Sequence, residues 1–285
     1  MDKNYQSEWA SSTMKGLLGD LLTKLTIAIS TALLILYHMF TNFVHGIEDY
    51  AGTEFEKVVD DFDGIPELYK SFGMITLVLG VVTLLAIVLK FFGINQFARI
   101  QWEEKTMFNI IKVRTGIIIH CVLFGILIIN AFTGVLTGLG WTILIATWLM
   151  LLIGFVLQAL GYHGLHHSAE MSERARKGAR TLRRANNFMS LALLTLAGAL
   201  VWGFAKVKEA IEYFSNAFLN FDVETLEQLN QMDQGALKSQ FETLGLILAA
   251  AMLFIVFFVI VSFACTIWGW IRLHSAKNDL PAAEA

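Results

Sequence analysis

Long apolar runs separated by polar segments are the main pattern of this chain. Six runs approach the ~20 residues needed to cross a hydrocarbon core. They cover residues 25–47, 72–92, 115–137, 141–162, 189–208 and 244–270. Backbone polar groups in lipid must be hydrogen-bonded within the protein, so each run is expected to be a helix. The pattern predicts an all-α polytopic membrane helical bundle with six transmembrane helices, forming one integral membrane domain over 1–285.

The polar segments between the runs predict how the chain crosses the membrane. Segments 90–114 and 163–187 are rich in lysine and arginine, whereas 48–71 and 209–243 are acidic. Basic loops stay on the cytoplasmic side. Both termini are therefore expected to be cytoplasmic, and the two acidic segments are expected outside, with helical segments of their own.

The amino-acid composition also indicates a membrane protein. Of 285 residues, 56% are hydrophobic and 16% are charged, whereas soluble domains are about one quarter charged. Cys121 and Cys265 fall within expected spans, and we interpret them as buried small apolar residues. The first apolar run is a full span rather than a short leader, so no cleavable signal peptide is expected.

Three histidines and a glutamate gather in GYHGLHHSAE, residues 161–170. On a helix, His163, His166, His167 and Glu170 would form one continuous stripe. One interpretation is a polar collar, in which the imidazoles lie at the inner headgroup level. The alternative is a metal site, in which His163 and His167 share one ion and Glu170 adds an oxygen ligand.

Two other histidines, His38 and His120, lie well inside expected spans. Paired histidines in a helical bundle can hold haem, provided that they lie at similar depth. His120 is ~7 Å and His38 is ~20 Å from the inner boundary, at 1.5 Å per residue. One haem shared by the two is therefore disfavoured. No cofactor is expected, with haem b bound by His38 or His120 as the alternative.

The expected spans contain few charged residues. No acidic or basic residue lies deep within any of them, and Lys90 is close enough to an end to reach the interface. This counts against a proton-coupled carrier, which usually needs an ionisable group inside the membrane. The remaining polar groups are interpreted as interhelical hydrogen-bonding partners, or alternatively as a channel lining: Ser30, Asn130, Thr133, Gln158 and Ser262.

The basic run SERARKGARTLRRANN, residues 172–187, is predicted to be a cytoplasmic connector. Its positive charges surround a helix instead of marking one face, and they would attract anionic lipid. No nucleic-acid recognition module accompanies them, so no nucleic-acid partner is expected.

Function is predicted from architecture, because no catalytic motif is present. The interpretation is a non-enzymatic multi-pass membrane protein that acts as a structural or accessory subunit of a membrane assembly. Its partners would be other membrane subunits or copies of itself, in a bacterial-type inner or plasma membrane. Two alternatives stay open: a haem-b electron-transfer subunit, and a channel or facilitator.

Overall fold

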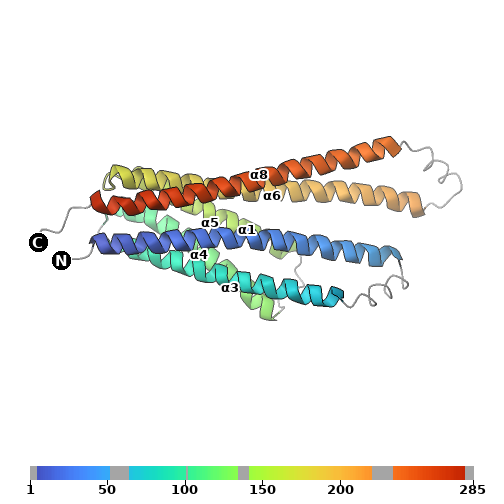
Figure 1. Ribbon diagram of the computed structural model, residues 1–285, viewed down its shortest axis with the longest axis horizontal. Helices are drawn as coiled ribbons and strands as arrows, with labels where there is room; N and C mark the ends of the chain where they lie inside the picture. The colour runs from blue at the N-terminus through green and yellow to red at the C-terminus, as the bar shows by residue number, and fades with distance from the viewer. Residues whose placement is uncertain (1–4, 52–63, 101, 134–140, 220–233, 280–285) are drawn as a thin grey trace, which may run out of the picture. The chain divides into compact units, whose positions relative to one another are not determined.

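The computed structural model describes residues 5–51, 64–100, 102–133, 141–219 and 234–279, with the side chains of 34–73 and 206–242 left outside the description. These described residues form helices and no strand. The helices are α1 (Tyr5–Ala51), α3 (Gly64–Ala98), α4 (Glu104–Thr133), α5 (Trp141–His166), α6 (Glu173–Leu219) and α8 (Gln234–Ser275), followed by a short 3-10 helix, η2 (Ala276–Asp279) (Figure 1). The predicted all-α class is confirmed for this part of the chain.

Five of these helices are long and apolar enough to cross a membrane. The spans lie at Met74–Ala98, Glu104–Thr133, Ile145–His166, Glu173–Gly203 and Gly245–Asp279. They overlap five of the six expected runs, which supports an integral membrane protein. The sixth run, 25–47, lies within α1, where the side chains of residues 34–51 are outside the description. The membrane sidedness of the termini stays a prediction.

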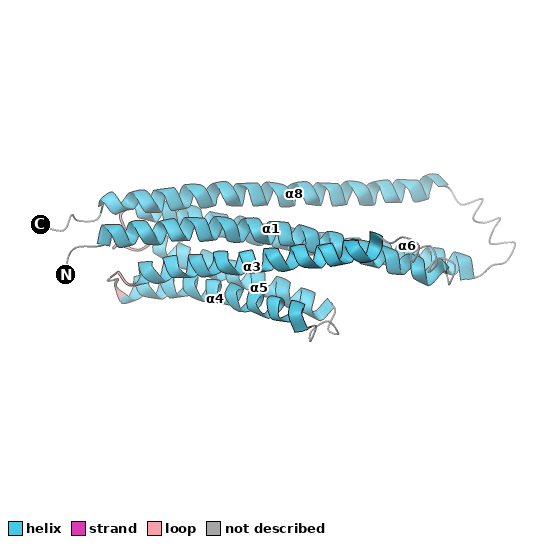
Figure 2. Cartoon of the chain, turned by 60° about the horizontal axis from the view of Figure 1, so that its bottom comes forward, coloured by secondary structure: helices cyan, strands magenta, loops and turns pink. Residues whose placement is uncertain are grey.

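The chain divides into two compact units. Unit 1 comprises Met1–Asn187 and Phe263–Ala285, and unit 2 comprises Phe188–Ser262. Within unit 1, α1 packs along α3, α4 packs along α5, and α3 also packs against α4 (Figure 2). Unit 2 consists of the later part of α6 and the earlier part of α8, where the rings of Phe188 and Phe258 stack with centroids 6.1 Å apart.

The core of unit 1 is strongly aromatic where α1 begins. The Trp9 ring meets Phe97 with centroids 4.8 Å apart, and Phe97 meets Trp102 at 5.1 Å. The indole N–H of Trp9 donates to the Leu273 carbonyl at 2.6 Å, which joins the start of α1 to the end of α8. Aromatic rings combine a large apolar area with a polar handle, so they can close such a junction without leaving a buried donor unpaired.

The basic run is helical and forms the start of α6, and its role as a cytoplasmic connector stays a prediction. Ser172 caps the helix, because its hydroxyl accepts the N–H of Ala175 at 3.3 Å. A face of small side chains then turns inward, with Ala175, Ala179 and Ala185 almost completely buried. The start of α6 therefore packs against its neighbours despite the basic residues around it, because the small alanine side chains let the neighbouring backbone approach closely.

The acidic segments 48–71 and 209–243 are helical where the structure describes them. Helix α1 continues to Ala51, and α6 continues to Leu219. Residues 138–140, between the third and fourth expected spans, lie outside the described residues.

Candidate functional site

Three charged side chains are buried together inside unit 1. Asp20 and Lys24 lie one turn apart on α1, and Lys90 lies on α3. Their side chains are 0–2% exposed. We call these three residues the ionic cluster. Because buried charges are costly unless they are paired, their contacts determine whether this region is stable.

Asp20 is the centre of the cluster and receives donors from three helices. Its Oδ1 accepts from Lys90 Nζ at 2.5 Å. Its Oδ2 accepts from the Trp270 indole of α8 at 3.0 Å and faces Lys24 Nζ at 3.4 Å. Lys24 Nζ also contacts the Thr266 hydroxyl of α8 at 2.7 Å. One carboxylate thus connects α1, α3 and α8.

A neutral chain extends the cluster to α4 and α5. Lys90 Nζ donates to Gln158 Oε1 at 2.6 Å, and Gln158 Nε2 lies 3.4 Å from His120 Nδ1. His120 Nε2 is 3.0 Å from the Leu151 carbonyl. A carbonyl can only accept, so Nε2 carries the imidazole proton and Nδ1 accepts from the glutamine amide. The side chains of Gln158 and His120 are therefore both hydrogen-bonded within this network.

Glycines make room for these contacts. A Cβ at Gly19 would overlap the backbone of Lys90, and a Cβ at Gly93 would lie 2.7 Å from the backbone N of Gly16. Because these glycines have no side chain, α1 and α3 approach closely, and the side chains of Asp20 and Lys90 meet between the two helices. Gly16 in turn lies against the ring of Trp270, which leaves the indole N–H free to reach Asp20.

Charged side chains are buried in unit 1 even though the expected spans have no acidic or basic residue deep within them. Lys90 does not extend to the interface, because its Nζ is directed at Asp20 and Gln158. Asp20 and Lys24 lie just before the first expected span, so the hydropathy pattern placed both residues outside the spans. A local sequence pattern could have identified Asp20 and Lys24: they are an acidic and a basic residue at i and i+4 within the otherwise apolar stretch GLLGDLLTKLTIAIS, residues 16–30.

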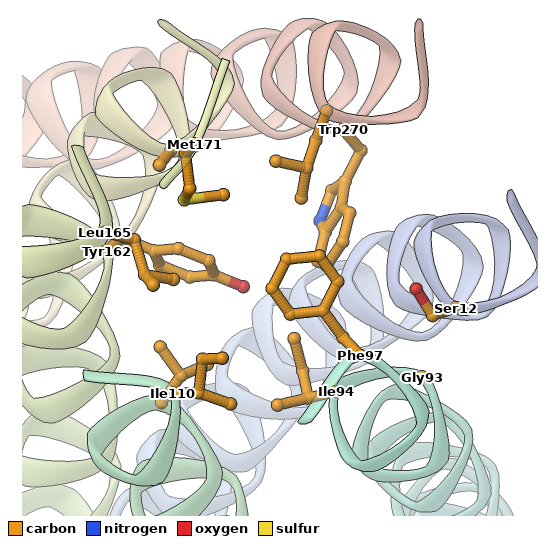
Figure 3. Close-up of a pocket in the computed structure, with 12 residues that line it drawn as sticks. Ser12, Gly93, Ile94, Phe97, Ile110, Tyr162, Leu165, Met171 and Trp270 are labelled. Carbon is orange, nitrogen blue, oxygen red and sulfur yellow. The ribbon is translucent and has the colours of Figure 1, made fainter. Parts of the chain in front are cut away.

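A small cavity borders this region (Figure 3). It has a volume of about 10 Å³, which is about the room of one water. Apolar side chains dominate its wall, including Ile94, Phe97 and Ile110, and Trp270 closes one side. The hydroxyl of Tyr162 points into it and has no hydrogen-bond partner among the described residues.

The surroundings of His120 do not fit a haem ligand. An axial histidine must present a free ring nitrogen to the iron, but both His120 nitrogens contact protein groups. The backbone at Gly154 also lies against the ring, since a Cβ there would overlap His120. His38 lies on α1, and its side chain is outside the description.

The histidine stripe expected at residues 163–170 does not form, because α5 ends at His166. His167 and Glu170 follow the helix, so the i to i+7 spacing no longer places them on one face. Glu170 accepts the backbone N–H of Glu103 at 2.8 Å, and His163 Nδ1 lies 2.9 Å from an Arg183 nitrogen. Among the described residues, no group of three or more histidine, cysteine or acidic side chains is arranged to hold a metal.

The histidines of this turn nevertheless remain close to one another. The rings of His163 and His167 have centroids 4.8 Å apart, and those of His166 and His167 are 4.7 Å apart. His166 Nδ1 lies 3.1 Å from the Arg176 carbonyl near the start of α6. These contacts link the end of α5 to α6, and the polar collar at the headgroup level stays a prediction.

Comparison of the chain with known protein families, with curated proteins and with solved structures finds no match. The fold and the ionic cluster therefore define the protein only as an all-helical, membrane-type protein.

Proposed function

We propose that the protein is a non-enzymatic multi-pass membrane protein that acts as a structural or accessory subunit of a membrane assembly. The observation that carries the proposal is helix length. Helices α1 and α6 each have 47 residues and α8 has 42. At 1.5 Å per residue these are ~60–70 Å long, about twice the ~30 Å hydrocarbon core. Rods of this length extend well past the bilayer and offer surface to a partner.

The packing of unit 1 supports a structural role, because specific contacts hold its helices together. Indole donors join α1 to α8 at both Trp9 and Trp270, and the ionic cluster joins α1 to α3. Outward-facing apolar side chains recur along α4 at steps of three or four residues, with one step of seven: Phe108, Ile111, Ile118, Val122, Ile126, Ile129 and Phe132. Such a stripe suits lipid or the helix of another subunit.

The cytoplasmic end offers a second contact surface, toward anionic lipid. Arg174, Lys177, Arg180 and Arg184 are exposed along the first turns of α6. A basic residue near an anionic membrane surface contributes about 1 kcal/mol of attraction. We place the protein in a bacterial-type inner or plasma membrane on this basis and on the expected positive-inside topology.

The channel and haem alternatives have weaker support. The Thr133 hydroxyl donates to the Ile129 carbonyl of its own helix, and Gln158 is engaged by Lys90 and His120. These groups are satisfied within the protein instead of lining a path. A Soret band that shifts on reduction would establish haem, and conductance in liposomes would establish a channel.

The test is the mass of the particle extracted with its surrounding membrane. We expect native nanodiscs to release a particle heavier than one 31.9 kDa chain, with stoichiometric partner or self copies. Glu212→Pro would break the α6 extension, because proline removes a helical hydrogen bond, and should reduce the mass to one chain. Glu212→Ala is the matched control and should keep the large particle. A wild-type particle that contains one chain only would refute the proposal.

A further inference from the structure

The ionic cluster contains an uneven number of charges. In their ordinary ionisation states, Asp20 carries one negative charge, whereas Lys24 and Lys90 together carry two positive charges. All three side chains are 0–2% exposed. A buried charge without a counter-charge is costly, and a group in that position gives up its charge instead. One of the three is therefore expected to be neutral under some conditions.

Asp20 and Lys90 are the better-paired members. Lys90 Nζ has two short acceptors, Asp20 Oδ1 at 2.5 Å and Gln158 Oε1 at 2.6 Å. Asp20 receives the Trp270 indole N–H as well as the lysines. The Asp20 carboxylate thus has three donors, and the Lys90 ammonium has two short acceptors.

Lys24 is the member with the weakest ionic contact. Its Nζ lies 3.4 Å from Asp20 Oδ2, and its short contact, at 2.7 Å, is with the Thr266 hydroxyl. A hydroxyl can donate or accept, so it is compatible with an ammonium and with a neutral amine.

Among the described residues, the groups that face Lys24 from the neighbouring helices include no acidic side chain that could supplement Asp20. Lys90 on α3 repels the charge of Lys24, whose contact on α8 is the Thr266 hydroxyl; the Cys265 thiol on α8 is also within electrostatic reach. His120 of α4 lies beyond Lys90 in its neutral form, and Tyr162 of α5 is a phenol. The cavity beside Trp270 is too small and apolar to hold a balancing anion. Among the described residues, Asp20 is the single carboxylate that serves both lysines.

We propose that Lys24 is a buried proton-binding site, at which the ammonium releases one proton to water and becomes an amine while the Asp20–Lys90 pair stays ionised. The net charge of the cluster changes from +1 to 0 in this step. Because Lys24 and Asp20 both contact α8, through Thr266 and Trp270, the bound proton also alters the junction between α1 and α8. The proposal goes beyond the structural role and does not depend on it.

The direct test is nitrogen NMR of the full-length protein with lysine side chains labelled at Nζ, in nanodiscs, from about pH 6 to about pH 10. We expect one lysine to convert from ammonium to amine well below the ordinary range near pH 10.4. Lys24→Met should remove that signal. Lys15→Met is the matched control on the same helix, where Nζ contacts the neutral Gln96 at 2.9 Å, and should keep it. Lysines that all titrate in the ordinary range, or an early signal that survives in K24M, would overturn the proposal.

A second variant keeps the test informative if K24M does not fold. Lys90→Met leaves one carboxylate and one ammonium, so Lys24 gains a counter-ion of its own. We expect its conversion to move up to the ordinary lysine range, a shift of about one pH unit or more. If the early signal disappears in K90M without reappearing at higher pH, Lys90 is the exchanging residue and the assignment to Lys24 is wrong. A signal that does not move in K90M would equally refute the argument from charge balance.

Discussion

Replacing Asp20 by asparagine is the most informative perturbation of this protein. The change keeps the size of the side chain and removes its charge. An amide has one acceptor oxygen, whereas the carboxylate serves Lys90, Lys24 and Trp270 at once. In Asp20→Asn the amide nitrogen cannot accept, so at least one buried donor loses an acceptor.

The expected cost follows from the burial of the cluster. Removing one partner of a buried ion pair costs about 3–5 kcal/mol, because the other charge stays buried without compensation. For a chain of this size, 1 kcal/mol corresponds to about 2–4 °C in Tm. Asp20→Asn is therefore expected to lower the Tm by about 6–20 °C.

Unfolding can be followed with a thiol-reactive fluorophore, since Cys121 and Cys265 are free and partly buried. Asp279→Asn is the matched control, because Asp279 forms a 3.5 Å ion pair with Arg174, whose side chain is 61% exposed. A surface pair contributes about 0–1 kcal/mol, so this variant should melt close to the wild type. If D20N melts no earlier than D279N, the cluster does not hold the helices together and the reasoning fails.

A compensating variant separates the loss of an ion from the loss of packing. Lys24→Met and Lys90→Met combined with D20N remove all three charges while keeping side chains of similar length. We expect this triple variant to be more stable than D20N alone, because a buried ion set replaced by neutral groups leaves no uncompensated charge. A triple variant less stable than D20N would indicate that asparagine damages the site for another reason.

Four further outcomes follow from particular contacts, and the first three can be measured with the same unfolding assay. Gly19→Ala should destabilise the protein by about 1–3 kcal/mol, because the added methyl meets the backbone of α3. Gly125→Ala meets nothing within 4 Å and should instead stabilise its helix by about 0.5–1 kcal/mol. Trp9→Phe should cost about 1 kcal/mol, since its indole N–H donates to a backbone carbonyl near the end of α8. Alanine at both His163 and His167 should leave metal content unchanged, and loss of stoichiometric zinc or iron in elemental analysis would contradict the polar-collar interpretation.

The hydrophobic pattern was sufficient to predict helices and their approximate places. An apolar run of ~20 residues has one stable backbone solution in lipid, whatever its neighbours are. Five of the six expected runs accordingly fall in helices that can cross a membrane. The ends of the helices were harder to predict from the sequence, because they depend on capping and packing. Ser172 starts α6 well before the expected span at 189, and His166 ends α5 inside the expected histidine stripe.

The ionic cluster was decided by tertiary structure. Asp20 and Lys90 are 70 positions apart, and hydropathy scores each of them as a polar residue near the end of a run. Their burial depends on close approach of α1 and α3, which Gly19 and Gly93 permit. Sequence by itself therefore determined where the chain enters an apolar environment, because that depends on local composition. Only the packing of distant helices determined which charges enter with it, because a charge is stable there only when a partner from elsewhere in the chain meets it.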